Sequence, residues 1–203
     1  MLVLENKHRL NSRRLTGMKI VITGACGDLG SAISRKLFDC GAHLVLWDID
    51  KEGLNRISND LGDTCHVDQV DITDPDSVSN ASEYVETKFG GLDILINNAG
   101  ILPPYGPTWA LTPEQFRKVH DVNLMGAFLC IRAFVPQLQR SQKNHGKARI
   151  INMASYLGCE PQGFDSAYAS SKAGLIALTK SLAKELASEG ILVNCVAPTV
   201  VES

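Results

Sequence analysis

Residues 19–30 read KIVITGACGDLG, a short apolar run followed at once by a turn that holds three glycines. The run Lys19–Thr23 is rich in β-branched residues and apolar nearly throughout, which predicts a strand covered by helices on both faces. Gly24, Gly27 and Gly30 then lead directly into a helical pattern. Glycines let a backbone turn tightly against a pyrophosphate, and a helix N-terminus favours negative charge. A glycine-rich turn between a strand and a helix therefore predicts a dinucleotide-binding site.

The same alternation of strand and helix patterns continues along the chain. Further strands are predicted at His43–Trp47, Thr64–Val70, Ile94–Asn97, Arg149–Met153 and Leu192–Val196. Helices are predicted at Gly30–Cys40, Lys51–Leu61, Pro75–Phe89, Pro113–Val122, Met125–Gln142 and Tyr168–Ser188. Repeated β-α-β units with right-handed crossovers predict an α/β fold: a Rossmann-type, doubly wound parallel sheet with helices on both faces. We expect residues 1–17 to form an N-terminal arm and residues 18–203 a single domain.

Composition excludes several classes of protein. Apolar residues make up 44% and charged residues 21% of the chain, as in ordinary globular proteins, and the formal net charge is −2. This balance gives no reason to expect nucleic acid or an anionic membrane as a partner. The six cysteines are scattered, without metal-ligand spacing, so we expect no metal site. Their scatter and the lack of a signal sequence predict a cytoplasmic protein.

Asp48 ends the second predicted strand, after the glycine turn. A carboxylate at this place accepts hydrogen bonds from the adenosine ribose hydroxyls and repels a 2′-phosphate. No Arg or Lys lies within the glycine turn, so NAD is favoured over NADP as the cofactor. The alternative is that Asp48 only begins the turn D-I-D-K, a common role for Asp.

Tyr168 and Lys172 stand four residues apart in the segment Y-A-S-S-K, with Ser155 upstream. Residues i and i+4 share a helix face, so the phenol and the ammonium can serve one reacting centre. The ammonium favours the phenolate, as a catalytic acid or base requires. Ser155, at the end of a strand, is placed to hold a substrate oxygen. The alternatives are a turn residue for Ser155 and a solvated helix charge for Lys172.

From about Met18 to Ser203 the chain resembles the short-chain dehydrogenase/reductase family, and its shorter branch in particular. The motif Asn97-Asn98-Ala99-Gly100 follows the fourth predicted strand, Asn123 lies in D-V-N-L, and Ser155 precedes the Y-x-x-x-K pair. The resemblance implies hydride transfer between NAD and a small secondary alcohol or ketone, with Tyr168 as the general acid and base. It also implies a homodimer or homotetramer, paired through the long helices predicted at 125–142 and 168–188.

The resemblance assigns a role to each site residue. It gives Asn123 a water that links Lys172 to solvent, and it places the Lys172 ammonium on the nicotinamide ribose. Asp71 is expected to meet the adenine amino group. The expected catalytic residues are Asn123, Ser155, Tyr168 and Lys172. The expected cofactor-binding residues are Gly24, Gly27, Asp28, Leu29, Gly30, Asp48, Asp71, Ile72, Asn98, Gly100, Tyr168, Lys172, Val201 and Ser203.

Two positions depart from the family pattern. Asp28 stands where the family has a glycine, with Gly27 one place earlier, and Pro198 is followed by Thr199 instead of glycine. The spacing G-x-x-G-x-x-G is that of the extended branch, so an epimerase or dehydratase is one alternative. A non-catalytic NAD-binding scaffold is another. Family members continue beyond the position of Ser203 with a substrate lid and a last strand, which this sequence does not include.

The residues around the expected substrate site are mostly apolar or aromatic. They predict an apolar to amphipathic wall, and no basic cluster marks an acidic substrate. For Trp109, packing under the helix that follows is the favoured alternative. The residues are Leu102, Pro103, Pro104, Tyr105, Trp109 and Phe164.

Overall fold

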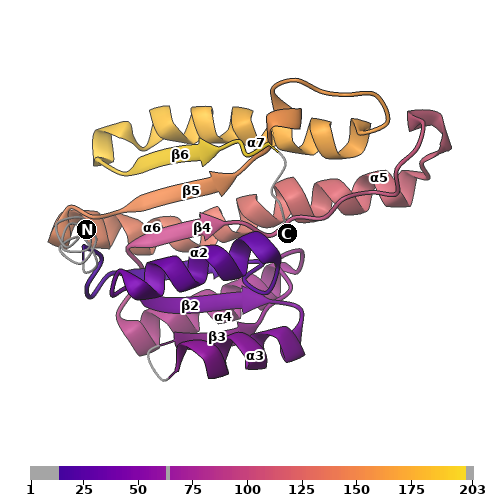
Figure 1. Cartoon of the computed structure of the whole chain (residues 1–203). Helices are drawn as coiled ribbons and strands as arrows, with labels where there is room; N and C mark the ends of the chain where they lie inside the picture. Colours follow the sequence, from indigo (N-terminus) through magenta and orange to yellow (C-terminus); the bar gives the residue numbers. More distant parts are fainter. Residues whose placement is uncertain (1–13, 63–64, 200–203) are drawn as a thin grey trace, which may run out of the picture.

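One parallel sheet of six strands, in the order β3-β2-β1-β4-β5-β6, forms the centre of the molecule (Figure 1). The structure is a computed structural model that describes residues 14–62 and 65–199. Its strands are β1 Lys19–Thr23, β2 His43–Asp48, β3 Cys65–Gln69, β4 Ile94–Asn97, β5 Arg149–Met153 and β6 Leu192–Val196. The strand order reverses between β1 and β4, which confirms the predicted doubly wound α/β fold.

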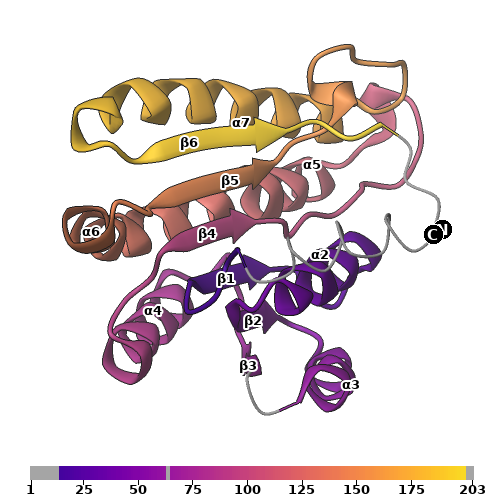
Figure 2. The same ribbon diagram turned by 60° about the vertical axis from the view of Figure 1, so that its left-hand side comes forward.

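Helices cover both faces of the sheet (Figure 2). Helices α2 (Asp28–Asp39) and α3 (Lys51–Leu61) pack on one face, whereas α4 (Pro75–Phe89), α6 (Ala127–His145) and α7 (Ser166–Glu185) pack on the other. Helix α5 (Pro113–His120) precedes α6. Short 3-10 turns lie at η1 (Thr108–Ala110), η3 (Tyr156–Gly158) and η4 (Ala187–Glu189).

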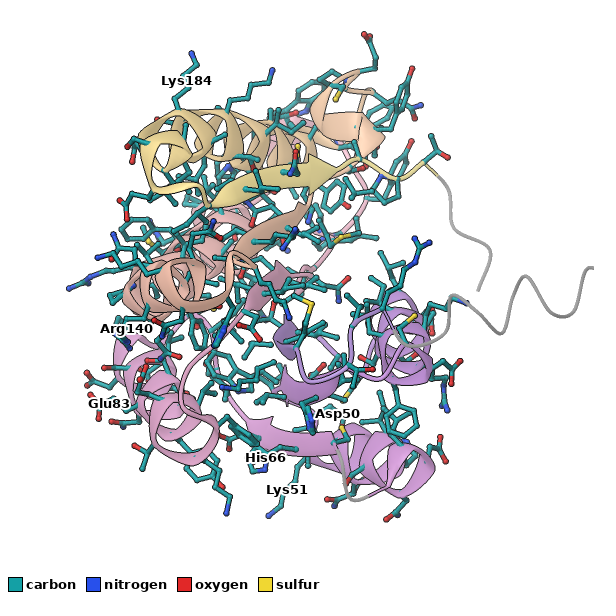
Figure 3. All side chains as sticks on the ribbon, turned by 90° about the vertical axis from the view of Figure 1, so that its left-hand side faces the viewer. Asp50, Lys51, His66, Glu83, Arg140 and Lys184 are labelled. Atoms are coloured by element: carbon teal, nitrogen blue, oxygen red, sulfur yellow. The ribbon has the colours of Figure 1, made fainter. Side chains whose placement is uncertain are left out.

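The core forms two apolar clusters, one on each side of the sheet. Alternate residues of β1 divide between them: Val21 packs toward α4 and α6, and Ile20 and Ile22 pack toward α2 and α3. Trp47 and Phe134 stack in the first cluster with ring centroids 5.3 Å apart. Charged side chains such as Lys51, Glu83 and Lys184 point away from the core into solvent (Figure 3). At the sheet edge, Leu192 and Val196 of β6 are about half exposed.

Most element boundaries agree with the sequence-based prediction, and the helix caps explain why. Asp74 accepts a hydrogen bond from the Asp76 backbone N–H, with Pro75 at the first helical position of α4. Thr112 and Gln115 form the predicted capping box of α5. These caps satisfy N–H groups that a helix leaves without an internal partner. Helix α4 therefore starts and ends where its pattern predicted.

Several boundaries differ from the prediction, among them the end of β2, which is Asp48 rather than Trp47. Helix α2 begins at Asp28, two residues before the predicted Gly30, with Gly27 as its N-cap. Helix α7 begins at Ser166 rather than Tyr168 and ends at Glu185, where η4 takes over. Strand β3 spans Cys65–Gln69 within the predicted Thr64–Val70, of which Thr64 lies outside the described residues.

The predicted break between two helices near residue 123 is wrong. A π-helical segment, η2 (Asp121–Gly126), joins α5 to α6, so the helix continues from Pro113 to His145. Ile72 presses on η2 so closely that a Cβ on Gly126 would lie 2.5 Å from it. In the part of the chain described here, this is also the helix long and apolar enough to cross a membrane, but 44% of that window is buried in the protein. Cys130, Phe134 and Leu138 of this helix belong to the first apolar cluster of the core.

The predicted boundary between arm and domain falls in a described turn. The Leu15 backbone N–H donates to the Cys40 carbonyl at 3.1 Å, and the Leu15 side chain packs on the second cluster. Contact with the domain thus begins at least as early as Leu15. Residues 1–13 of the predicted arm lie outside the described residues.

Candidate active site

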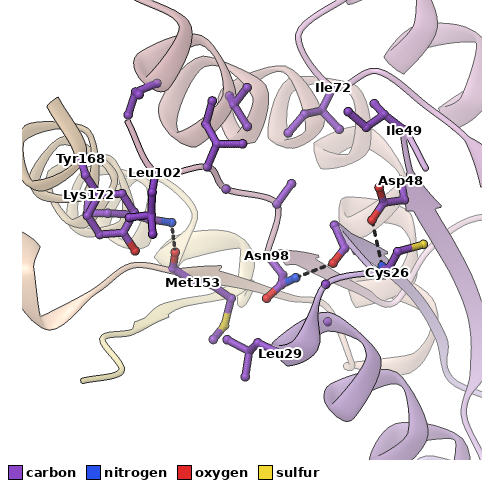
Figure 4. A pocket seen from close by; sticks show the side chains of 18 of the residues that line it. Cys26, Leu29, Asp48, Ile49, Ile72, Asn98, Leu102, Met153, Tyr168 and Lys172 are labelled. Carbon is purple, nitrogen blue, oxygen red and sulfur yellow. Dashed lines mark hydrogen bonds between the residues drawn. The ribbon is translucent and has the colours of Figure 1, made fainter. Parts of the chain in front are cut away.

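A cavity of about 1120 Å³ runs along the carboxyl edge of the sheet, across the point where the strand order reverses. Figure 4 shows Asp48 and Cys26 at one end, Tyr168 and Lys172 at the other, and Asn98 between them. Open α/β sheets bind ligands at this point. Among the predicted residues, the cavity is lined by Gly24, Gly27, Asp28, Leu29, Gly30, Asp48, Asp71, Ile72, Asn98, Gly100, Ser155, Tyr168 and Lys172.

The glycine turn has no room for side chains at two positions. A Cβ on Gly24, where φ is +64°, would lie 2.6 Å from the Ala99 backbone. A Cβ on Gly30 would lie 2.1 Å from the Gly24 carbonyl oxygen. At Gly27 the nearest atom would be 3.7 Å away. Gly24 and Gly30 are therefore required by the turn itself, and Gly27 is not.

Asn98 fastens this turn to the end of β4. Its side-chain amide donates to the carbonyl oxygens of Thr23 and Gly24 at 3.1 and 2.9 Å. The Thr23 hydroxyl in return accepts from the backbone N–H groups of Asn98 and Ala99, both at 3.1 Å. Sequence reasoning assigned Asn98 to the cofactor, and the structure shows its side chain bonded to the turn at the cavity wall.

Asp48 holds the backbone and also faces the cavity. Its Oδ2 accepts from the Cys26 backbone N–H at 2.8 Å, and its Oδ1 accepts from the Asp50 N–H at 3.0 Å. The turn role considered for Asp48 is thus real. A carboxylate has about four acceptor positions, so capacity for ribose hydroxyls remains. Partial burial, followed by the charges of Asp48 and Asp50, raises the pKa of the Cys26 thiol to about 12.

Asp28 is exposed in the first turn of α2, beside the glycine turn. An acidic side chain there interacts favourably with the helix dipole. The first-turn N–H groups of α2 have no partner within the helix. They lie at the end of α2 that lines the cavity. The Asp28 carboxylate therefore competes with any anionic ligand for this positive end.

Asp71 and Ile72 line the same end of the cavity as Asp48. The Asp71 Oδ1 accepts from the Thr73 N–H and hydroxyl at 2.8 and 2.7 Å, which fixes the loop after β3. Ile72 contributes an apolar surface. It packs closely against η2 because Gly126 has no side chain there. This end of the cavity combines the carboxylates of Asp48 and Asp71 with the apolar side chain of Ile72. Such a combination suits a planar base next to a ribose.

Lys172 is a buried cation, 3% exposed, and not a solvated helix charge. Its Nζ donates to the Met153 carbonyl oxygen at 2.7 Å and lies 5.6 Å from the centroid of the Tyr168 ring. Burial lowers the pKa of Lys172 to about 8. The Lys172 Nζ donates one hydrogen bond, to Met153, so it can also interact with a negatively charged group in the cavity.

Ser155 and Tyr168 face the cavity from two different elements. Ser155, after β5, is 8% exposed, and its Oγ accepts from the Leu157 N–H at 3.2 Å, so it also caps η3. Tyr168 is half-buried on the first turns of α7. This end of the cavity therefore brings together a hydroxyl, a phenol and an ammonium.

Asn123 is almost fully buried, in the π-helical segment. Its Oδ1 accepts from the Ile101 N–H at 2.8 Å, and its amide donates to the Ile101 carbonyl and the Ser171 hydroxyl at 3.0 and 3.1 Å. These bonds join η2, the loop after β4 and α7. A Cβ on Gly100 would lie 3.2 Å from the Lys172 Nζ and 3.3 Å from the Asn123 Oδ1. Asn123 thus lies behind Lys172 but does not line the cavity.

The remaining predicted residues divide into four groups. Leu102, Pro103 and Pro104 line the cavity, as expected for its apolar wall. Tyr105 and Phe164, predicted for the same wall, are not among the lining residues. Trp109 is 87% exposed, so the favoured alternative of packing under a helix is wrong. Val201 and Ser203 lie outside the described residues.

Several residues of the site carried no signal in the sequence. The Met153 carbonyl acts through its backbone, and Ser171 is one of two adjacent serines with nothing to distinguish it. Lys118 and Val119 of α5 and Val122 of η2 also line the cavity. Only the pattern of α5, with its buried Val119, hinted at an inward face.

The family model "short chain dehydrogenase" matches residues 18–203. A 2-dehydro-3-deoxy-L-rhamnonate dehydrogenase (NAD(+)) from Sphingomonas sp. (strain SKA58) is 36% identical over 190 residues, covering 94% of this chain and 74% of the relative. The human 3-hydroxyacyl-CoA dehydrogenase type-2 is 36% identical over 194 residues, covering 92% and 74%.

A similar solved structure has the same fold. The crystal structure of 3-ketoacyl-(acyl-carrier-protein) reductase from Brucella melitensis, complexed with NADH, superposes with a TM-score of 0.88 at 32% identity. The match covers 91% of this chain and 75% of that one. Fold, motif order and family model agree, and the chain belongs to the short-chain dehydrogenase/reductase family of oxidoreductases.

Proposed function

We propose that the protein is an NAD(H)-dependent oxidoreductase that interconverts a secondary alcohol and a ketone, with Tyr168 as general acid and base. The observation that carries the proposal is the burial of the Lys172 ammonium next to Tyr168, in the same cavity as the glycine turn. A buried cation needs a compensating partner, and a phenolate or a ribose hydroxyl oxygen can be one.

The residues that line the cavity are compatible with a dinucleotide. Side chains are excluded at Gly24 and Gly30, so a pyrophosphate can approach the backbone at the start of α2. Asp48 stands at one end for the adenosine ribose, and Lys172 stands at the other for the nicotinamide ribose. When bound, the nicotinamide supplies or accepts the hydride.

In the oxidative direction, the Tyr168 phenolate takes the proton of the substrate hydroxyl as the carbon–oxygen bond becomes a carbonyl. In reduction, the Tyr168 hydroxyl returns that proton to the new alkoxide. The Lys172 ammonium stabilises the phenolate. Ser155 donates a hydrogen bond to the substrate oxygen and orients it. Asn123 keeps an acceptor position on Oδ1 for a water that relays protons from Lys172 to solvent.

Tyr168→Phe removes the proton carrier and keeps the ring. We expect kcat to fall by about 10³-fold, because general acid–base catalysis contributes on this order. The dissociation constant of NADH, measured by fluorescence titration, should stay within about threefold because the ring remains, an energy difference below 1 kcal/mol. Tyr156→Phe, which makes the same change at an exposed tyrosine, is the control. Retained turnover in Tyr168→Phe would show that Tyr168 is not the acid and base.

The buried Lys172 also makes stability depend on pH. Its pKa is about 8 in the folded protein because the side chain is buried, against an ordinary value of 10.5. Between these pH values the unfolded chain holds a proton that the folded chain has lost, so stability should rise with pH relative to Lys172→Met. The expected slope approaches about 1.4 kcal/mol per pH unit. Urea unfolding of both proteins between pH 7 and 10 measures it; a difference that does not change with pH would contradict the buried charge.

We also propose NAD rather than NADP as the cofactor. Asp48 and Asp50 stand together at the adenosine end, and Asp28 adds a third carboxylate nearby. The basic side chains that line the cavity, within the described residues, are Lys118 and Lys172. A 2′-phosphate at Asp48 would place like charges together, and the cation on this side, Arg56, pairs with Asp50 at 3.4 Å and does not line the cavity. Two relatives support the proposal, one named with NAD(+) and one solved with NADH.

Asp48→Asn tests this preference, because the amide keeps one acceptor oxygen for the backbone and removes the charge. We expect the wild-type protein to bind NADH at least about 100-fold tighter than NADPH, and the variant to narrow that ratio to about 10-fold or less. Titrations with both nucleotides measure the ratios. Asp68→Asn on β3 is the matched control, since Asp68 does not belong to the cavity lining. An unchanged ratio in Asp48→Asn would rule out this role.

A non-catalytic NAD-binding protein is the second candidate, and the observation that favours it is Asp28. Its carboxylate at the α2 N-terminus weakens the attraction for a pyrophosphate. Binding of NADH without turnover of any alcohol or ketone would support this candidate. The extended-branch alternative has no comparable observation in its favour.

We further propose a homodimer or homotetramer. Phe116, Met125 and Phe128 lie along α5, η2 and the start of α6, and they are 39, 49 and 42% exposed. Such a run of large apolar side chains is typical of an interface. Light scattering after size-exclusion chromatography should give twice or four times the mass of the chain. A mass of one chain at every concentration would contradict the proposal.

A further inference from the structure

Two aromatic side chains meet beside the catalytic end of the cavity. The rings of Tyr105 and Phe164 lie 5.5 Å apart between centroids, with 54° between their planes. Tyr105 is 78% exposed and Phe164 is 48% exposed. Solvent exposure of this extent means that the contact adds little to the core. The exposed faces of the two rings can instead contact a ligand.

The two rings belong to loops that lie next to the cavity. Tyr105 follows Pro104, which lines the cavity, in the loop after β4. Phe164 lies in the loop that leads into α7, four residues before Tyr168, which also lines the cavity. These loops lie side by side at the same end of the molecule in both views (Figures 1 and 2). The ring pair therefore joins the two loops just outside the residues that line the cavity.

The backbone of Phe164 is strained. Its φ is +72°, and within the described residues it is the one position other than glycine with a positive φ. A bulky residue rarely adopts this conformation, and such strain persists where the surroundings hold it, often at functional sites. Here the conformation turns the ring toward Tyr105. The positive φ of Phe164 thus accompanies an exposed ring that contacts Tyr105.

The surface near this pair is apolar. Leu102 is 70% exposed, and Pro103 and Pro104 follow it. Residues 101–111 contain no charged side chain. An exposed apolar surface next to a cavity is typical of a ligand-binding groove.

We propose that Tyr105 and Phe164 form an aromatic clamp that binds the apolar substituent of the substrate. The enzyme then selects secondary alcohols and ketones that carry an alkyl chain or a ring over short or charged ones. This inference rests on the proposed oxidoreductase function. The clamp contacts the substrate away from the reacting carbon, so it sets substrate preference and takes no part in proton transfer.

A series of 2-alkanols from propan-2-ol to octan-2-ol, oxidised with NAD, tests the clamp. In the wild-type protein, kcat/KM should rise about threefold to fourfold for each methylene that the clamp buries. In Tyr105→Ala and Phe164→Ala the rise should fall to less than about twofold. NADH binding should not change. Trp109→Ala, an exposed aromatic in the same connection between β4 and α5, is the matched control and should keep the wild-type slope.

Phe164→Gly separates substrate binding from structural support. Glycine accepts a positive φ without strain, so the thermal midpoint should hold or rise by about 2 °C while the slope is lost. A lower midpoint with an unchanged slope would show that the ring only supports the loop. Equal slopes in all variants would overturn the clamp, and failure to oxidise any alcohol despite NADH binding would overturn the proposed function itself.

Discussion

The side-chain amide of Asn98 makes the interaction on which the site depends. By donating to the carbonyls of Thr23 and Gly24, it joins the end of β1 to the end of β4 at the point where the strand order reverses. The junction is so close that Gly24 has no space for a side chain against Ala99. Without this bond, the two carbonyl groups would lose a hydrogen-bond donor and the glycine turn would lose a connection to the end of β4. The cavity on both sides of the junction is shaped by it.

At the other end of the cavity, a second hydrogen-bond network fixes the positions of Lys172 and Asn123. Asn123 connects the loop after β4 to Ser171 of α7, and the Met153 carbonyl at the end of β5 holds the Lys172 Nζ. The π-helical segment places Asn123 for these bonds, as is common for π-turns at functional sites. The ammonium is thus held by a backbone carbonyl, and in the proposed reaction such preorganisation would lower the cost of stabilising charge.

The sequence predicted the strands well, because apolar runs bounded by glycine turns admit few alternatives, and β1, β4, β5 and β6 have the predicted limits. It failed where a tertiary contact decides. The pattern around Asn123 indicated a break, but a π-helical segment keeps the helix continuous, with Ile72 packed against Gly126. The hydrogen bonds from the Asn98 amide to Thr23 and Gly24 carried no signal either, because these partners lie 75 and 74 positions earlier in the chain. The roles of the site residues and the cytoplasmic localisation stay predictions.

The central claim is that one dinucleotide spans the cavity from Asp48 to Tyr168, and a crystal structure of the protein with NADH tests it most directly. The account predicts the adenosine ribose on the Asp48 carboxylate and the nicotinamide ribose on the Lys172 Nζ. It also predicts that the nicotinamide C4 is open toward Ser155 and Tyr168, with room for a substrate carbon about 3–3.5 Å away. A nicotinamide ring bound away from Tyr168, or turned so that its C4 faces the protein, would contradict it.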